Sequence, residues 1–217
     1  MVIRSASGLI AAVIAALAIA WPAVAQGPKP GRSSDAPKSS QRSLPQPPSE
    51  LPRHPSDKSH TLDVLFSALK VAPDDATARQ VEARIWAIWA TTPSDAAALL
   101  AARAKTAMDN KKLDVALSLL DVVVRLRPDY IEGWNRRATI YYLKNDYARS
   151  LADIRQVLSR EPRHFGALAG LGMIMQDLGD EKRALEAFRQ ALAVNPRLEK
   201  VPDMVKSLTE KVEGRDI

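Results

Sequence analysis

Cysteine is absent from the 217 residues of this chain, and aromatic residues make up only 5% of it. The lack of cysteine excludes disulfide bonds, thiol nucleophiles, cysteine-ligated zinc and iron–sulfur clusters. The three histidines, His54, His60 and His164, have no second ligand at metal-binding spacing. No nucleophile or acid–base constellation is visible either. The sequence therefore predicts a non-catalytic protein without a metal or other cofactor.

Long hydrophobic runs are equally scarce, and the single one lies near the start of the chain. Arg4 precedes an uninterrupted apolar run from Leu9 to Ala20, and Ala23-Val24-Ala25 follows it. This order is typical of a secretory signal peptide, and the run is shorter than the roughly 20 residues that a membrane-spanning helix needs. We expect a signal peptide over residues 1–25, cleaved after Ala25, and a periplasmic location in a bacterium with two membranes. The alternative is a retained membrane anchor.

The net charge of +6 is unevenly distributed along the chain. Residues 26–60 hold eight of the 15 prolines and six Lys or Arg against three Asp or Glu, which predicts a disordered basic tether. Residues 61–217 hold 24 basic and 22 acidic residues, so the folded part has no electrostatic footprint for nucleic acid. The tether could make weak contact with an anionic envelope surface, although a solubilising spacer is the simpler interpretation.

The second half of the chain contains an internal repeat. Pro128, Pro162 and Pro196 are separated by 34 residues each time. Alignment on these prolines brings further positions into register as columns of large residues and of small residues. The large columns are Leu100, Trp134 and Leu168, and Leu120, Ile154 and Phe188; the small columns are Ala104, Ala138 and Gly172, and Ala116, Ser150 and Ala184.

This pattern resembles the tetratricopeptide repeat (TPR) family, whose 34-residue motif is W-x2-L-G-x2-Y, A-x3-F and a final proline. The resemblance is closest in residues 165–198, good in 131–164 and weaker in 97–130. Arg103 and Arg137 replace the usual leucine, and Ala107 replaces the aromatic residue. The resemblance implies an all-α fold, an α-solenoid of antiparallel helix hairpins that forms a superhelix.

Both ends of such an array need caps, because no single hairpin can bury its own apolar face. Residues 61–96 show helical periodicity, and we expect a degenerate hairpin that caps the N-terminal end. Residues 199–217 place Val201, Val205, Leu208 and Val212 on one stripe, which predicts a C-terminal capping helix. The predicted TPR-like domain is therefore 61–217.

The resemblance also implies a binding surface, because the first helices of TPR hairpins line a concave groove. An extended or helical segment of another protein would bind there. The family's groove positions correspond here to Lys105, Asp109, Asn135, Arg136, Thr139, Tyr142, Met173 and Gln176. The competing interpretation is an ordinary solvated inner face.

Two further features bear on partner recognition. One TPR variant clamps a C-terminal carboxylate with lysines, but this chain has Glu132 at a lysine position and Gly166 and Gly170 in the next repeat, which disfavours that clamp. Trp86 points away from the apolar side of its predicted helix. It is a candidate for a second binding surface, although a tryptophan that covers the edge of the first hairpin is the more common situation.

The sequence as a whole favours a scaffold or adaptor for protein–protein interaction in the bacterial periplasm or cell envelope. The partner would be another protein or a peptide segment, not nucleic acid, and no transmembrane span would remain after signal cleavage. The alternative function is a wall- or membrane-associated structural factor for envelope integrity that acts through the basic tether.

Overall fold

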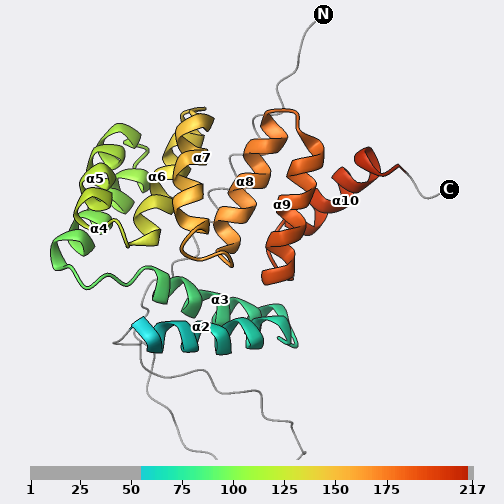
Figure 1. The fold of residues 1–217 in the computed structure, drawn as a ribbon, viewed down its shortest axis with the longest axis horizontal. Helices are drawn as coiled ribbons and strands as arrows, with labels where there is room; N and C mark the ends of the chain where they lie inside the picture. Colours follow the sequence, from blue (N-terminus) through green and yellow to red (C-terminus); the bar gives the residue numbers. More distant parts are fainter. Residues whose placement is uncertain (1–54, 215–217) are drawn as a thin grey trace, which may run out of the picture.

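The computed structural model describes residues 55–214, and in this range the secondary structure consists of nine α-helices without a strand (Figure 1). The predicted signal peptide and residues 26–54 of the predicted tether lie outside the described residues. The helices are α2 (Pro55–Lys70), α3 (Asp75–Trp89), α4 (Asp95–Asp109), α5 (Leu113–Leu126), α6 (Ile131–Leu143), α7 (Tyr147–Leu158), α8 (Phe165–Asp177), α9 (Glu181–Val194) and α10 (Val201–Val212).

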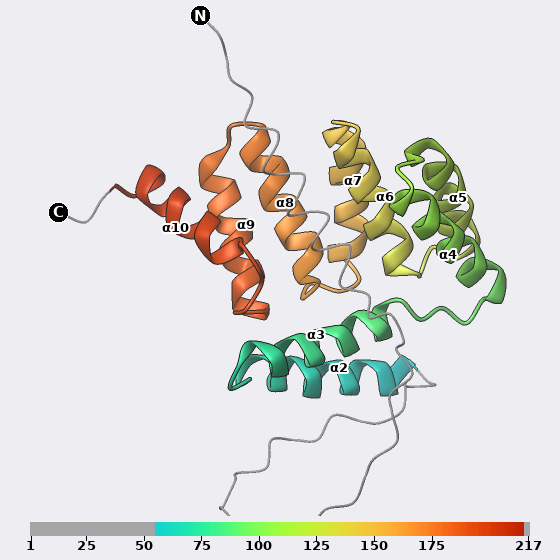
Figure 2. The ribbon, with the colours of Figure 1, turned by 180° about the vertical axis from the view of Figure 1, so that it is seen from behind.

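Helices α4–α5, α6–α7 and α8–α9 form three antiparallel hairpins that stand side by side in chain order (Figure 1, Figure 2). Small residues let the two helices of each hairpin approach closely. At Gly172, a Cβ atom would lie 2.6 Å from the Phe188 ring, so only glycine fits there. The predicted all-α solenoid of helix hairpins is confirmed.

The turn inside each hairpin has the same geometry in all three repeats. Lys111, Asn145 and Gly179 are 34 residues apart and all have positive φ angles, of 58°, 57° and 80°. The amide of the next residue reaches back to a carbonyl of the first helix, as in the bond of 2.8 Å from Asp146 N to Tyr141 O. The carboxylate of Asp146 then accepts a hydrogen bond from Arg149 N and caps the second helix.

The departure of Arg137 from the family's leucine has a structural reason. Its guanidinium donates to Asp153 of the same repeat at 2.7 Å and to Asp121 of the preceding repeat at 2.8 Å. It also lies over the Trp134 ring, 4.8 Å from the centroid. The hydrogen bonds that Arg137 donates to Asp153 raise the pKa of its guanidinium and outweigh burial, which opposes the charge. Two repeats are thus joined by a partly buried ion-pair network.

Helix α10 closes the C-terminal end of the array, where it packs on α9. Val201 and Leu208 are buried, whereas Lys211 lies outside and pairs with Glu181 at 2.9 Å. The helix thus combines an apolar inner stripe with a charged outer side, as a cap requires.

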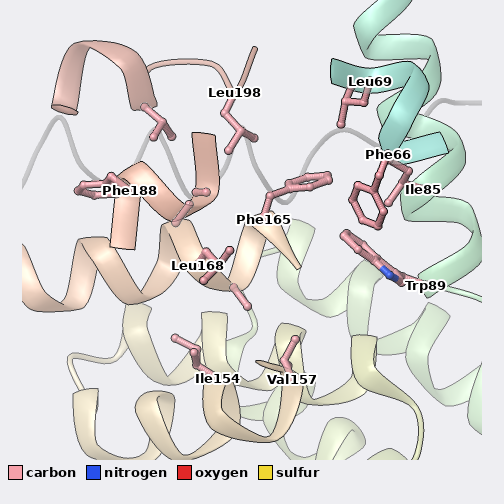
Figure 3. Packing of buried hydrophobic residues seen from close by; sticks show 14 of the residues in the cluster. Phe66, Leu69, Ile85, Trp89, Ile154, Val157, Phe165, Leu168, Phe188 and Leu198 are labelled. Carbon is pink, nitrogen blue, oxygen red and sulfur yellow. The ribbon is translucent and has the colours of Figure 1, made fainter. Parts of the chain in front are cut away.

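The N-terminal hairpin, α2–α3, occupies a different place from the one predicted. It begins at Pro55, earlier than the expected start at Thr61. It runs across the lower ends of the other hairpins in both views and does not stack on α4 as a first unit (Figure 1, Figure 2). The expected cap at the N-terminal end of the array is therefore wrong. The reason is aromatic packing, because Phe66 and Trp89 bury themselves beside Phe165 of the third repeat (Figure 3).

This placement lets the α2–α3 hairpin contact the junctions before α6, before α8 and after α9. Tyr130, before α6, donates its hydroxyl to Ala90 O at 3.1 Å. Arg163, before α8, forms an ion pair with Asp63. After α9, Arg197 forms an ion pair with Asp75. The main hydrophobic core consequently joins the α2–α3 hairpin to the second and third repeats, whereas the first repeat has smaller clusters of its own.

Candidate partner-binding face

The first helices of the three repeats, α4, α6 and α8, contact one another along one face, which we call the inner face. Arg136 of α6 donates to Ala101 O of α4 at 3.5 Å. At the other end of α6, Tyr142 donates its hydroxyl to Asp177 of α8 at 2.8 Å. These two predicted groove residues therefore lie where adjacent first helices meet.

Four of the predicted groove residues offer partly exposed polar groups on α4, α6 and α8. Asn135 donates to Glu132 at 3.2 Å, and Thr139 donates to the Asn135 carbonyl at 3.0 Å, so both are oriented by their own helix. Lys105 and Gln176 are also partly exposed. Amides, a hydroxyl and an ammonium can together bind the backbone and polar side chains of a peptide.

Asp109 lies at the end of α4 and is exposed. It pairs with Lys105 at 2.7 Å, one helical turn earlier. An exposed ion pair of this kind is weak, so both charges stay accessible to a charged partner.

Two of the predicted groove residues are buried and hold the helices together. Met173 is 1% exposed and Tyr142 is 8% exposed. Burial, and then the acceptor Asp177, raise the pKa of the Tyr142 hydroxyl, which stays protonated and donates. The positions match the family's groove, but in this chain the two side chains are large enough to reach the next helix. Met173 and Tyr142 therefore serve the packing of the helices.

A buried polar pair lies at the start of α6 and α8. His164 receives a hydrogen bond on Nδ1 from Ala167 N at 3.0 Å, so its proton is on Nε2, which donates to Glu132 Oε1 at 2.9 Å. Burial alone would raise the pKa of Glu132, but the hydrogen bond from His164 and the nearby charge of Arg136 lower it. The Glu132 carboxylate is thus ionised, and its partners His164 and Arg136 belong to the same chain. From the sequence, His164 was considered only as a metal ligand, so this pairing with Glu132 was not predicted.

Trp86, the candidate for a second binding surface, is partly buried and packs against the hydrophobic core. Its six-membered ring covers Gly166, where a Cβ atom would come within 2.7 Å of it. It meets Phe165 edge to face, with centroids 5.4 Å apart. Trp89 stacks on His164 at 4.1 Å. The hairpin thus fills the space beside Gly166.

Sequence reasoning missed the polar contact between α3 and the end of the third repeat. Asn195 donates to Glu82 at 3.0 Å, and Asn195 is fully buried. Burial raises the pKa of Glu82, and hydrogen bonds from Trp86 and Asn195 counteract it. The only signal was that asparagine precedes the proline in this repeat, whereas Arg127 and Glu161 precede it in the others.

Within residues 55–214, no three acidic or histidine side chains gather as a metal-binding group would. Over the same range, none of the helices has the length and apolarity needed to cross a bilayer.

Three helix hairpins with a period of 34 residues and first helices on a common inner face define an α-solenoid, the architecture of a protein–protein interaction scaffold. The tetratricopeptide repeat model matches residues 131–164 and 165–198. A TPR repeat-containing protein of Rhizobium etli is 37% identical over 159 residues, which cover 73% of this chain and 78% of that protein. The chain belongs to the tetratricopeptide repeat family.

Solved structures share the fold at low sequence identity. The first TPR domain of Spaghetti (RPAP3), bound to the HSP90 peptide SRMEEVD, has 15% identity and a TM-score of 0.53; the match covers 56% of this chain and 97% of that domain. MamA has 16% identity and a TM-score of 0.52, over 74% of this chain and 82% of the MamA chain. These similarities concern the fold alone.

Proposed function

We propose that this protein is a non-catalytic scaffold that binds a segment of another protein on its inner face. The observation that supports this most is the set of partly exposed polar side chains, Lys105, Asn135, Thr139 and Gln176, on three adjacent first helices. A TPR domain with the same fold holds a peptide. The TPR repeat family to which the chain belongs also favours a protein partner.

The segment is bound without a carboxylate clamp. Glu132 occupies a position where that clamp needs a lysine, and its buried carboxylate would repel an anionic chain end. Trp86 covers Gly166, so the start of α8 has no room for a partner side chain. At Gly170, by contrast, a Cβ atom would meet only Ile154, at 3.7 Å, which leaves space for a partner side chain there.

We further propose that the scaffold works in the periplasm after removal of residues 1–25. The support is the order of charge, apolar run and Ala23-Val24-Ala25 in the sequence. Cell fractionation and N-terminal sequencing test this directly. A mature chain that begins at Gln26 in the periplasmic fraction is expected, and a chain with an intact N-terminus in the membrane fraction would contradict it.

The binding face is tested by crosslinking in intact cells, affinity capture and mass spectrometry. The test variant replaces Asn135, Thr139 and Gln176 with alanine, because these side chains are partly exposed and their loss leaves the core intact. The control variant replaces Gln190 and Ser207, which are exposed on α9 and α10, with alanine. We expect the test variant alone to lose the partner. Equal capture by both variants would refute binding on the inner face.

A second comparison separates the scaffold from a structural factor that acts through the basic tether. Residues 26–54 are deleted, because α2 begins at Pro55 and must stay intact. A scaffold keeps its partner after this deletion, whereas a tether-dependent structural factor loses its location in the envelope.

A further inference from the structure

The first repeat leaves uncovered the face that the later repeats bury. Gly133 and Ala167 occupy the same repeat position in α6 and α8, and both are buried; a Cβ atom at Gly133 would meet Val123 of the preceding hairpin at 3.1 Å. The equivalent residue of α4 is Leu99, which is 54% exposed. The α2–α3 hairpin does not cover it, because that hairpin lies across the ends of the other repeats (Figure 1).

A separate apolar stripe lies on α5, the second helix of the same repeat. Val115, Leu119, Val122 and Leu126 follow one another at spacings of four, three and four residues, which places them in one line along the helix. Val115 is 52% and Leu126 51% exposed. We call these four residues the α5 stripe.

The repeat pattern does not require the α5 stripe to be apolar. The equivalent residues 34 positions later, in α7, are all polar or charged, and those in α9 are mixed. They are Arg149, Asp153, Gln156 and Arg160 in α7, and Arg183, Ala187, Gln190 and Val194 in α9. The apolar character is therefore specific to the repeat whose face has no neighbour.

We propose that the α5 stripe is a self-association surface on which two copies of the chain pair their α5 helices antiparallel. The four–three–four spacing reads the same in both directions, so a two-fold axis brings Val115 opposite the partner's Leu126. The same axis brings Leu119 opposite the partner's Val122. An isologous contact needs a surface that complements itself in this way, and the spacing is that of a coiled-coil seam.

The charges beside the stripe select the antiparallel arrangement. The residues that precede the four stripe positions are Asp114, Ser118, Asp121 and Arg125. In the antiparallel pair, Asp114 lies opposite the partner's Arg125, and the axis repeats this pairing. A parallel pair would instead leave Asp114 about 16 Å along the helix axis from the partner's Arg125, so these two charges could not pair.

Both of these charged groups are accessible. Arg125 is exposed and forms no ion pair with any other residue in the described range 55–214. The side chain of Asp114 is 86% exposed, and its contact with Lys144, at 2.7 Å, leaves room for a second cation. A single helix pair buries less than the roughly 1,200 Å² of a stable interface, so the dimer is weak and concentration-dependent.

Sedimentation velocity tests the association with the full chain, produced by a bacterial host, from about 1 µM to 1 mM. We expect the wild-type chain to dimerise with rising concentration. Val115→Glu and Leu126→Glu should each raise the dimer dissociation constant at least about tenfold. Leu178→Glu is the matched control, because Leu178 is 55% exposed on another surface, and it should dimerise like the wild type. Circular dichroism verifies that each variant is folded.

Cysteine crosslinking tests the arrangement, and the chain contains no cysteine that would interfere. Val115→Cys and Leu126→Cys chains are prepared separately and then mixed under mild oxidation. The mixture should form a disulfide-linked heterodimer, because residues 115 and 126 of different copies lie opposite each other. Each variant alone should not, because eleven residues of helix separate the two sulfur atoms by about 16 Å.

Several results would overturn the proposal. A wild-type chain that stays monomeric over the whole range would show that the stripe does not join two copies, whether another part of the chain or a different protein covers it. Dimers of Leu126→Glu as strong as the wild type would place the contact elsewhere. Crosslinking of Val115→Cys with itself would indicate a parallel pair.

Discussion

The two ends of the solenoid differ in how far other helices cover them. At the C-terminal end, α10 covers the third repeat, and the α2–α3 hairpin adds Trp89 beside Phe165. At the N-terminal end, the first repeat packs mainly small residues, such as Ala104 and Ala116, around Leu120, and its outer face is open. The comparison teaches that a repeat motif fixes the structure of each hairpin, whereas the elements outside the motif decide which faces are covered.

The largest effect is expected where the α2–α3 hairpin seals the third repeat. Trp89 is 3% exposed and stacks on His164, so Trp89→Ala leaves a large cavity. We expect a loss of about 3–5 kcal/mol in the free energy of unfolding, measured by urea denaturation. Leu99→Ala, at the open end, is the control and should change it by less than about 0.5 kcal/mol. Similar losses for both would mean that the two ends do not differ.

A smaller effect is expected from the buried pair between α6 and α8. Glu132→Ala removes the acceptor of the His164 Nε2 proton and should cost about 1–3 kcal/mol near neutral pH. Because the folded-state pKa of Glu132 is lowered, its contribution is complete above the ordinary value of 4.5 and is lost as the pH falls through the folded-state pKa.

Urea denaturation as a function of pH measures this linkage. The difference between the wild-type chain and Glu132→Ala should shrink below about pH 4.5. A difference that stays constant between neutral and acidic pH would contradict the ionised state of the buried carboxylate.

Hydrogen exchange compares the two ends without any substitution. The amides of α4 and α5 should exchange faster than those of α8 and α9 by about tenfold or more, because the first repeat has one neighbouring hairpin and a core of small side chains. The exchange is measured by mass spectrometry at low protein concentration, where no self-association protects α5. Equal protection of both hairpins would show that the array opens as one unit.

The smallest effect is expected at the outer side of α10. Arg189 donates to Glu213 at 2.6 Å, and both side chains are about half exposed, at 45% and 47%. Solvent screens such a pair, so Arg189→Ala should leave the urea midpoint unchanged within error. A clear shift would mean that the cap depends on its charges more than on Val201 and Leu208.

The sequence allowed the repeats to be predicted because the motif is local. Pro128, Pro162 and Pro196 set the period, and Gly172 marked the tight helix contact. The position of the α2–α3 hairpin could not be predicted, because periodicity shows that Trp89 is buried but not what buries it. The residues that form polar contacts with this hairpin are also distant from it in the sequence, as Asn195 is from Glu82.

The exposure of the residues at the candidate binding face was predicted only in part for the same reason. Family positions identified the row that contains Asn135 and Thr139, which are partly exposed on the inner face. They also included Tyr142 and Met173, which are buried here. Whether a side chain at a groove position faces solvent or bridges to the next helix depends on its length and on the neighbouring repeat, and neither is part of the motif.

The contacts of the α2–α3 hairpin with Tyr130, Arg163 and Arg197 affect the whole array. In a solenoid, each helix pair contacts only its nearest neighbours. Small rotations between repeats therefore add up and change the curvature of the superhelix. Because the α2–α3 hairpin contacts all three junctions, we expect it to restrict these rotations. We therefore expect the inner face to keep one curvature, so that a segment bound there as proposed would meet a preorganised surface.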